Sequence, residues 1–104
     1  MIEDKLNEKV LQQVSIANAL GVEFNVEKRQ PDIILVGNPK TKKVAVMGTT
    51  DIDGQELLVA YLLNVKKWTW ADDEGFSKDE IVEHFSKEIF TWISIDTVAE
   101  ELMS

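Results

Sequence analysis

The run Ile33-Ile34-Leu35-Val36 constrains the fold of this chain more than any other segment. Four consecutive apolar residues, three of them β-branched, are typical of a strand that is covered on both faces. Pro31-Asp32 precedes the run and Gly37-Asn38-Pro39 follows it, so turn residues bound the strand at both ends. The chain must therefore supply other elements that pack on each face of this strand.

Three further strands are predicted around this run. Apolar and polar residues alternate over residues 22–27, which indicates a strand with one face in solvent. Residues 43–47 hold another apolar run, and the short turn through residues 37–41 favours an antiparallel hairpin with the strand at 33–36. Residues 66–71 are expected to form a short fourth strand at the sheet edge, where lysines discourage aggregation.

Helices are predicted before and after the first three strands. Apolar residues recur at helical spacing over residues 2–20, and Gly21 is suited to end this helix. Asp53 and Glu56 match the reciprocal capping pattern of a helix N-terminus. We therefore expect a second helix over residues 56–65, with a wide apolar face.

Two more helices are predicted near the C-terminus. A second capping pattern at 77–80 begins a helix whose apolar stripe ends at Trp92, so we expect Trp92 to lie in the core. A last short helix is capped by Asp96 or Thr97. The predicted fold is α+β, with a small, mainly antiparallel sheet of three to four strands. An N-terminal helix and two to three C-terminal helices pack on this sheet, in a single domain over residues 1–104.

The sequence lacks the residue sets that catalysis commonly uses. It has no cysteine and a single histidine, His84. His84 has Glu80 and Glu88 at i−4 and i+4, a charge ladder that supports a helix. Residues 51–54, Asp-Ile-Asp-Gly, are similar to the start of a calcium-binding loop, but the glutamate needed at its twelfth position is replaced by Leu62. We therefore expect a protein that is not an enzyme and that holds no cofactor and no metal.

An alternative interpretation starts from Pro31-Asp32. The predicted order of helix, three strands, helix and strand over about residues 1–70 resembles the core of the PD-(D/E)xK nuclease superfamily. In that family, Pro-Asp opens the second strand, and an acid and a lysine on the third strand bind magnesium and activate water. Residues 44–47 of this chain carry Ala45 and Met47 where the acid and lysine would stand. The resemblance thus implies a nucleic-acid-handling protein on a degenerate core without cleavage activity.

The net charge of −8 is concentrated in the last third of the chain. Residues 1–71 hold nine acidic and nine basic residues, whereas residues 72–104 hold ten acidic residues and two lysines. An acidic surface attracts basic partners and repels phosphate, and a merely solubilising face is the alternative. Trp68 and Trp70 precede this acidic segment, and they are either core residues or interface anchors, since tryptophan is enriched in interface hot spots.

We therefore predict a non-enzymatic, acidic regulatory protein that binds a basic protein partner. Immunity proteins, antitoxins and small phage-encoded inhibitors or nucleic-acid mimics have this general character. Nucleic acid is not the expected partner, and nothing decides between a monomer and a homodimer. The absence of cysteine, of a secretory signal and of a membrane-length apolar run favours a cytoplasmic location. The predicted contact residues are Trp68, Trp70, Asp72, Asp73, Glu74, Asp79, Glu80 and Glu83.

Overall fold

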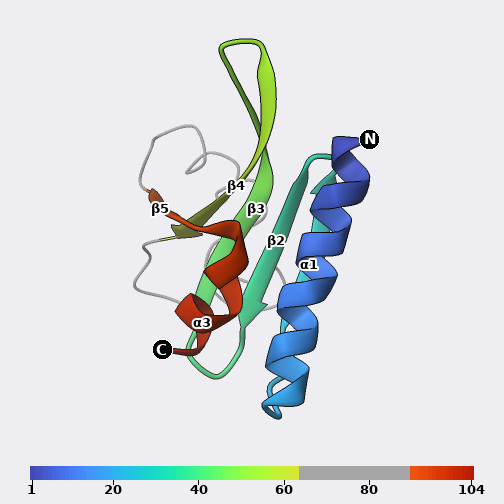
Figure 1. The fold of residues 1–104 in the computed structure, drawn as a ribbon. Helices are drawn as coiled ribbons and strands as arrows, with labels where there is room; N and C mark the ends of the chain where they lie inside the picture. Colours follow the sequence, from blue (N-terminus) through green and yellow to red (C-terminus); the bar gives the residue numbers. More distant parts are fainter. Residues whose placement is uncertain (64–89) are drawn as a thin grey trace.

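The computed structural model describes residues 1–63 and 90–104 of the chain (Figure 1). These residues confirm the α+β class, with an N-terminal helix, an antiparallel sheet and a short C-terminal helix. In chain order, the elements are α1 (Ile2–Ala19), β1 (Asn25–Gln30), β2 (Ile33–Asn38), β3 (Lys43–Ile52), β4 (Gln55–Leu63), β5 (Phe90–Ile93), the 3-10 helix η1 (Ile95–Thr97) and α3 (Val98–Met103).

The described sheet has five strands in the order β1-β2-β3-β4-β5, one more than the upper end of the prediction. Every neighbouring pair is antiparallel, including the predicted hairpin of β2 and β3. The strand order follows the chain order, so each strand lies beside the strand that precedes it in sequence. The long central strands β3 and β4 pair over nine positions, from Val44 opposite Leu63 to Ile52 opposite Gln55.

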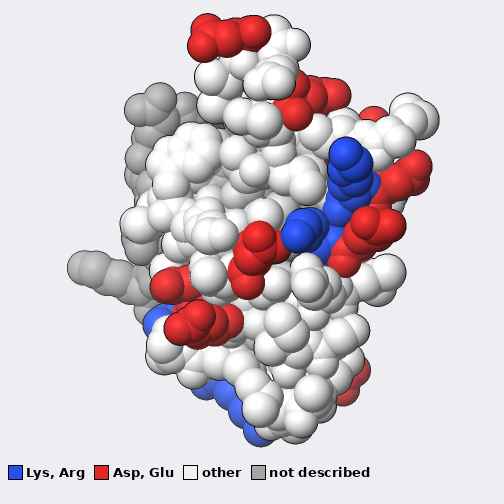
Figure 2. Space-filling model, in the orientation of Figure 1, with Lys and Arg blue, Asp and Glu red and all other residues white. Residues whose placement is uncertain are grey.

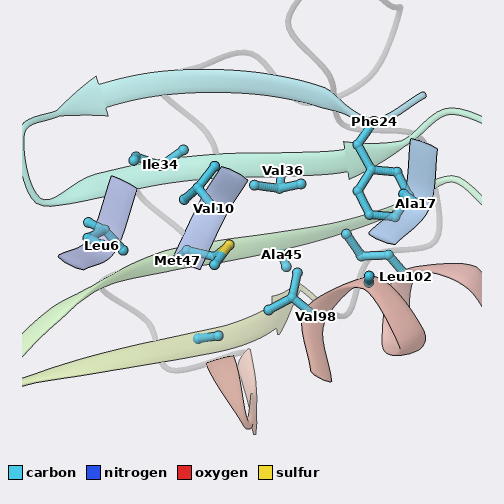
Figure 3. Close-up of a cluster of buried hydrophobic side chains, with 12 residues drawn as sticks. Leu6, Val10, Ala17, Phe24, Ile34, Val36, Ala45, Met47, Val98 and Leu102 are labelled. Atoms are coloured by element: carbon cyan, nitrogen blue, oxygen red, sulfur yellow. The ribbon is translucent and has the colours of Figure 1, made fainter. Parts of the chain in front are cut away.

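One face of the sheet is covered by α1 and α3, which lie on the same side of it (Figure 1). Apolar residues of the helices and of alternate strand positions form the core between these layers (Figure 3). The apolar spacing of α1 brings one face of that helix to the sheet, as the sequence predicts. The buried members of this core are Leu6, Val10, Ala17, Phe24, Ile34, Val36, Ala45, Met47, Ala60, Val98, Ala99 and Leu102.

The other face of the central strands is also apolar and buried. Leu35 of β2 is 1% exposed, and Val44 and Val46 of β3 are fully buried. Leu35 and Val46 are register partners, so their side chains lie on the same face, opposite to Ile34 and Met47. This confirms that the run at 33–36 is a central strand with both faces buried.

Close backbone approach explains why β3 carries a glycine beside the β1–β2 turn. The backbone N–H of Thr49 donates a hydrogen bond to the carbonyl oxygen of Asp32 at 3.3 Å. A Cβ atom on Gly48 would lie 2.8 Å from that same oxygen, closer than real side chains approach. Gly48 therefore lets the end of the β2–β3 pairing pack against the turn at Pro31-Asp32.

The helix predicted for residues 56–65 is wrong over residues 56–63, which belong to strand β4; residues 64 and 65 lie outside the described residues. Asp53 and Gly54 have φ values of 54° and 80°, which are the two positive values of a type I′ hairpin turn. The Asp53-Gly54 pair thus reverses the chain, and Glu56 pairs with Asp51 across the hairpin rather than capping a helix.

Two other element boundaries differ from the prediction. The first strand begins at Asn25 instead of residue 22, with Phe24 buried at 5% exposure just before it. Strand β1 continues to Gln30, with a register shift between Lys28 and Gln30, so the turn is shorter than the one expected over residues 28–31. The helix predicted to run through Trp92 is wrong over residues 90–93, which form β5.

The remaining predicted elements are partly tested. The last helix is confirmed as η1 followed by α3, and Thr97, one of its two predicted caps, is the N-cap of α3 without a side-chain hydrogen bond. The N-cap of η1 is Ser94, whose hydroxyl accepts from the backbone N–H of Asp96 at 3.3 Å. The strand predicted at 66–71 and the helix predicted from residue 77 to residue 89 lie outside the described residues. No helix of the described residues has the length and apolar character needed to cross a membrane.

Candidate functional site

All eight contact residues predicted from the sequence lie outside the described residues. They are Trp68, Trp70, Asp72, Asp73, Glu74, Asp79, Glu80 and Glu83, all within residues 64–89. Their roles therefore stay predictions. The described part of the chain presents a separate surface with the same chemical character, built from β3, β4 and β5.

The tip of the β3–β4 hairpin projects from the sheet as a two-stranded arm, residues 49–58 (Figure 1). Strand β2 pairs with β3 only as far as Gly48, and β5 pairs with β4 only over residues 60–63. Beyond these points β3 and β4 pair only with each other among the described strands. The hairpin arm therefore offers side chains and backbone edges that a central strand would bury.

Three carboxylates, Asp51, Asp53 and Glu56, give the hairpin arm a negative end. All three are exposed, and Figure 2 shows acidic side chains over this end of the molecule. Asp51 and Glu56 are register partners, so two like charges face each other across the hairpin. No lysine or arginine occurs between residues 44 and 65, and none of these carboxylates forms an ion pair within the described residues.

Facing like charges on an exposed pair of strands weaken the hairpin rather than support it. Opposite-charge pairs at such positions contribute roughly 0.2–1 kcal/mol, and like charges act in the other direction. Capping does not explain Glu56, because the segment is a strand. An incoming cation would neutralise both carboxylates, so the charge pattern fits a surface that receives a basic group from a partner.

An exposed apolar strip lies on the sheet face opposite to α1 and α3, whereas Asp51 and Glu56 lie on the α1 and α3 face. Alternation along the strands puts Trp92, Tyr61, Leu57 and Ile52 in this strip. Trp92 is 60% exposed, Ile52 49% and Leu57 41%. Trp92 and Tyr61 are register partners. Their ring centroids lie 4.2 Å apart, with an angle of 52° between the ring planes. Burial raises the pKa of the Tyr61 hydroxyl above its ordinary value.

The prediction that Trp92 lies in the core is wrong. Its strand is the last in the described sheet, and its side chain lies on the face that the described helices leave uncovered. Tyr61 supports one side of the indole and leaves most of its surface to solvent. Sequence reasoning assigned residues 90–93 to a helix, so the expected direction of this side chain was wrong as well.

Two buried polar side chains, which the sequence analysis did not single out, place the C-terminal elements. Gln13 of α1 is 1% exposed; its Nε2 donates to the carbonyl oxygen of Asp96 at 3.1 Å, and its Oε1 accepts from the N–H of Ala99 at 2.8 Å. Asn38 is also 1% exposed, and its Nδ2 donates to the carbonyl oxygen of Leu102 at 2.8 Å. Gln13 thus holds the beginning of α3, and Asn38 holds its end.

These hydrogen bonds satisfy both buried amides, so Gln13 and Asn38 have a structural explanation.

Within residues 1–63 and 90–104, no group of three or more His, Cys, Asp or Glu side chains could hold a metal ion. The described surface combines a protruding strand pair, exposed aromatic and aliphatic side chains, and carboxylates without an ion pair to another described residue, which are features that suit non-covalent binding. No known protein family, curated protein or solved structure matches the chain.

Proposed function

We propose that the chain is a non-enzymatic regulatory protein that binds a basic protein partner. The observation that carries this proposal is the hairpin arm, whose carboxylates form no ion pair within the described residues, together with the exposed Trp92 on the opposite face of the sheet. Tryptophan is the residue type most enriched in interface hot spots, and charge complementarity steers a partner into contact. The acidic segment of residues 72–104 adds ten acids against two lysines.

The two acidic regions would act together in this proposal. Trp68 and Trp70, with Asp72, Asp73, Glu74, Asp79, Glu80 and Glu83, form the first proposed contact set. Asp51, Glu56 and Trp92 form the second. A small protein that neutralises a basic partner in the cytoplasm, as an immunity protein, antitoxin or phage inhibitor does, is the class that this chemistry favours.

The nuclease-like alternative has less support than the sequence suggested. It rested on a helix after the third strand, and residues 55–63 form a strand there instead. Asp51 and Glu56 would also repel the phosphate backbone of a nucleic acid. We keep nucleic acid as an outcome of the experiment below.

Capture from a lysate of the source organism tests the proposal. The immobilised protein is washed at low and at high salt, and bound material is analysed by mass spectrometry and by nucleic-acid staining. We expect a basic protein that is retained at low salt and released at high salt, because salt screens exposed charges. Recovery of nucleic acid instead would contradict the proposal.

Two sets of charge reversals locate the contact. Asp51→Lys with Glu56→Lys keeps like charges facing each other on the hairpin arm, so the hairpin's own stability changes little. Glu8→Lys with Glu23→Lys makes the same change in net charge at exposed sites on α1 and in the loop after it. We expect the first pair to abolish retention and the second pair to reduce it only slightly. Reversal of Asp72, Asp73 and Glu74 should abolish it as well, and equal retention by all variants would overturn the proposal.

A further inference from the structure

From the edge of the hairpin arm that no described strand covers, we infer that the basic partner contributes an extended segment, which adds to β4 as a further strand beside Gln55–Leu58. The inference rests on the proposed function and specifies how the partner is recognised. Strand addition is a common way for a sheet edge to bind a peptide: main-chain hydrogen bonds supply affinity, and alternate side chains supply specificity. Free backbone groups, charge and side-chain alternation each support it here.

The turn geometry shows which backbone groups of β4 are free. A two-residue type I′ loop is closed by the pair Ile52–Gln55, which exchanges hydrogen bonds across the hairpin. Because such pairs alternate along an antiparallel ladder, the N–H and C=O groups of Glu56 and Leu58 point away from β3. Strand β5 lies on that side only from Ala60 onward, so Glu56 and Leu58 have no described strand beside them.

The incoming segment would lie in line with β5, on the same side of β4. Strand β5 ends at Ile93, and the chain then leaves the sheet through Ser94 into η1. Within the described residues, no strand continues the row that β5 begins beside Gln55–Leu58, although η1 contacts β4. Trp92, which pairs with Tyr61, lies on the same sheet face as Leu57 but about 13 Å further along the strand, so it makes this face apolar without contacting the added segment.

The side chains of the hairpin arm specify an alternating partner. On the face of α1 and α3, a residue opposite Glu56 would meet this carboxylate, with Asp51 one strand further away. On the other face, a residue opposite Leu57 would meet the Leu57 side chain. Because successive residues of a strand point to opposite faces, the segment that fits best alternates lysine or arginine with apolar residues.

Charge excludes a second copy of this chain as the favoured occupant. Two copies pairing through their β4 edges in antiparallel fashion, with Glu56 opposite Glu56, would bring these carboxylates together, and like charges that face each other across strands are destabilising. The net charge of −8 adds repulsion between copies. A basic segment relieves both.

Two octapeptides of identical composition test the inference. In the first, lysine and valine alternate; in the second, four lysines precede four valines, and both have blocked ends. Calorimetry at low salt should show about tenfold tighter binding of the alternating peptide, since only it can present charge and apolar surface on the correct faces. The alternating peptide can be N-methylated at every second backbone nitrogen in two patterns. The pattern that blocks the N–H groups facing β4 should remove the tighter binding of the alternating peptide. The two possible methylation patterns should therefore give different affinities.

Two substitutions at one position separate the hydrogen bond from the charge. Glu56→Gln removes the charge, and Glu56→Pro removes the charge together with the outward N–H, which β3 does not use. We expect Glu56→Pro to bind the alternating peptide several-fold more weakly than Glu56→Gln. Amide hydrogen exchange of the unmodified protein provides a check that needs no variant: the peptide should slow exchange at Glu56 and Leu58 about tenfold.

The outcomes distinguish this inference from the function on which it rests. Equal binding of the alternating and block peptides, with no protection of Glu56 or Leu58, overturns strand addition but leaves an acidic binding surface. Failure of both peptides to bind at low salt overturns both strand addition and the proposed binding of a basic partner. Preferential binding of the alternating peptide with protection at these two amides supports both.

Discussion

Gln13 shows how one buried polar residue orders a distant part of the chain. Its amide bridges the carbonyl oxygen of Asp96 and the N–H of Ala99, so α1 supplies the N-terminal partner that the short helix α3 needs. A six-residue helix is unstable alone, and its first N–H groups need acceptors. Because η1 and α3 follow β5 directly, this contact also supports the strand that carries Trp92.

Replacing Gln13 by alanine should therefore lower the free energy of unfolding by about 1–3 kcal/mol, because it leaves buried polar groups of the C-terminal segment without partners. The neighbouring Gln12 is exposed on the same helix and is a matched control. Gln12→Ala should change stability by less than about 0.5 kcal/mol. Urea denaturation followed by circular dichroism measures both values.

A third variant separates hydrogen bonding from packing. Gln13→Met keeps most of the volume of the side chain and loses both the donor and the acceptor of the amide, so it should cost nearly as much as Gln13→Ala. A Gln13→Met protein as stable as the original would contradict the bridging role, and the loss in Gln13→Ala would then come from a cavity.

At the scale of single elements, a segment is predicted correctly when its apolar spacing fits either a helix or a strand, and is ambiguous when it fits both. The apolar spacing of residues 2–19 fits only a helix, and α1 is found there. The run at 33–36 is too short and too β-branched for a helix, and it is β2. Strand β4 is apolar on both faces, so its leucines and Tyr61 fit a helical stripe as well as an alternating strand.

The turn before β4 held the information that would have decided between the two. Asp-Gly between apolar segments is a strong hairpin signal, because both residues tolerate positive φ. Asp53 and Glu56 also have the spacing of a helix cap, so the same residues favour a helix as well as a hairpin. Had the hairpin been recognised, the projecting acids of the arm would have followed from sequence. The exposure of Trp92 would not, because it depends on which face the helices cover.

The hairpin arm itself should be more stable with one charge reversed. Asp51→Lys places an ammonium group opposite Glu56 in place of a carboxylate, so the free energy of unfolding should rise by about 0.2–1 kcal/mol. The same change should weaken retention of the basic partner, because it removes one carboxylate and adds a repulsive charge. Thermal denaturation and the lysate capture measure the two effects on one protein.

Asp51→Ala is the control, since it removes the repulsion without adding an ion pair and alanine, like lysine, is depleted in strands. It should lie between the original protein and Asp51→Lys in stability. If Asp51→Lys were instead destabilised while partner binding was unchanged, the facing carboxylates would have a structural function, and the hairpin arm would not be the contact.

At the scale of the whole molecule, charge is unevenly distributed along the sheet. Strand β3 begins at Lys43, next to Lys40 and Lys42 in the β2–β3 turn, and ends beside the acids of the hairpin arm. Ten residues of extended chain separate these ends by about 30 Å. That distance exceeds the Debye length of about 8 Å at physiological ionic strength, so the lysines do little to neutralise the arm.

Salt should consequently act in opposite directions on the stability and on the binding of this protein. Mutual repulsion within a chain of net charge −8 opposes folding, so raising chloride salt from about 0.02 M to about 0.3 M should increase the melting temperature by a few degrees. The same salt should weaken binding of the basic partner. The control protein with Glu8→Lys and Glu23→Lys has a net charge of −4, since each reversal adds two, and it should gain less from salt. A melting temperature that falls with salt would mean that partner release at high salt reflects unfolding of the protein. A melting temperature that rises with salt would mean that the partner is released because salt screens its contact with the acidic surface.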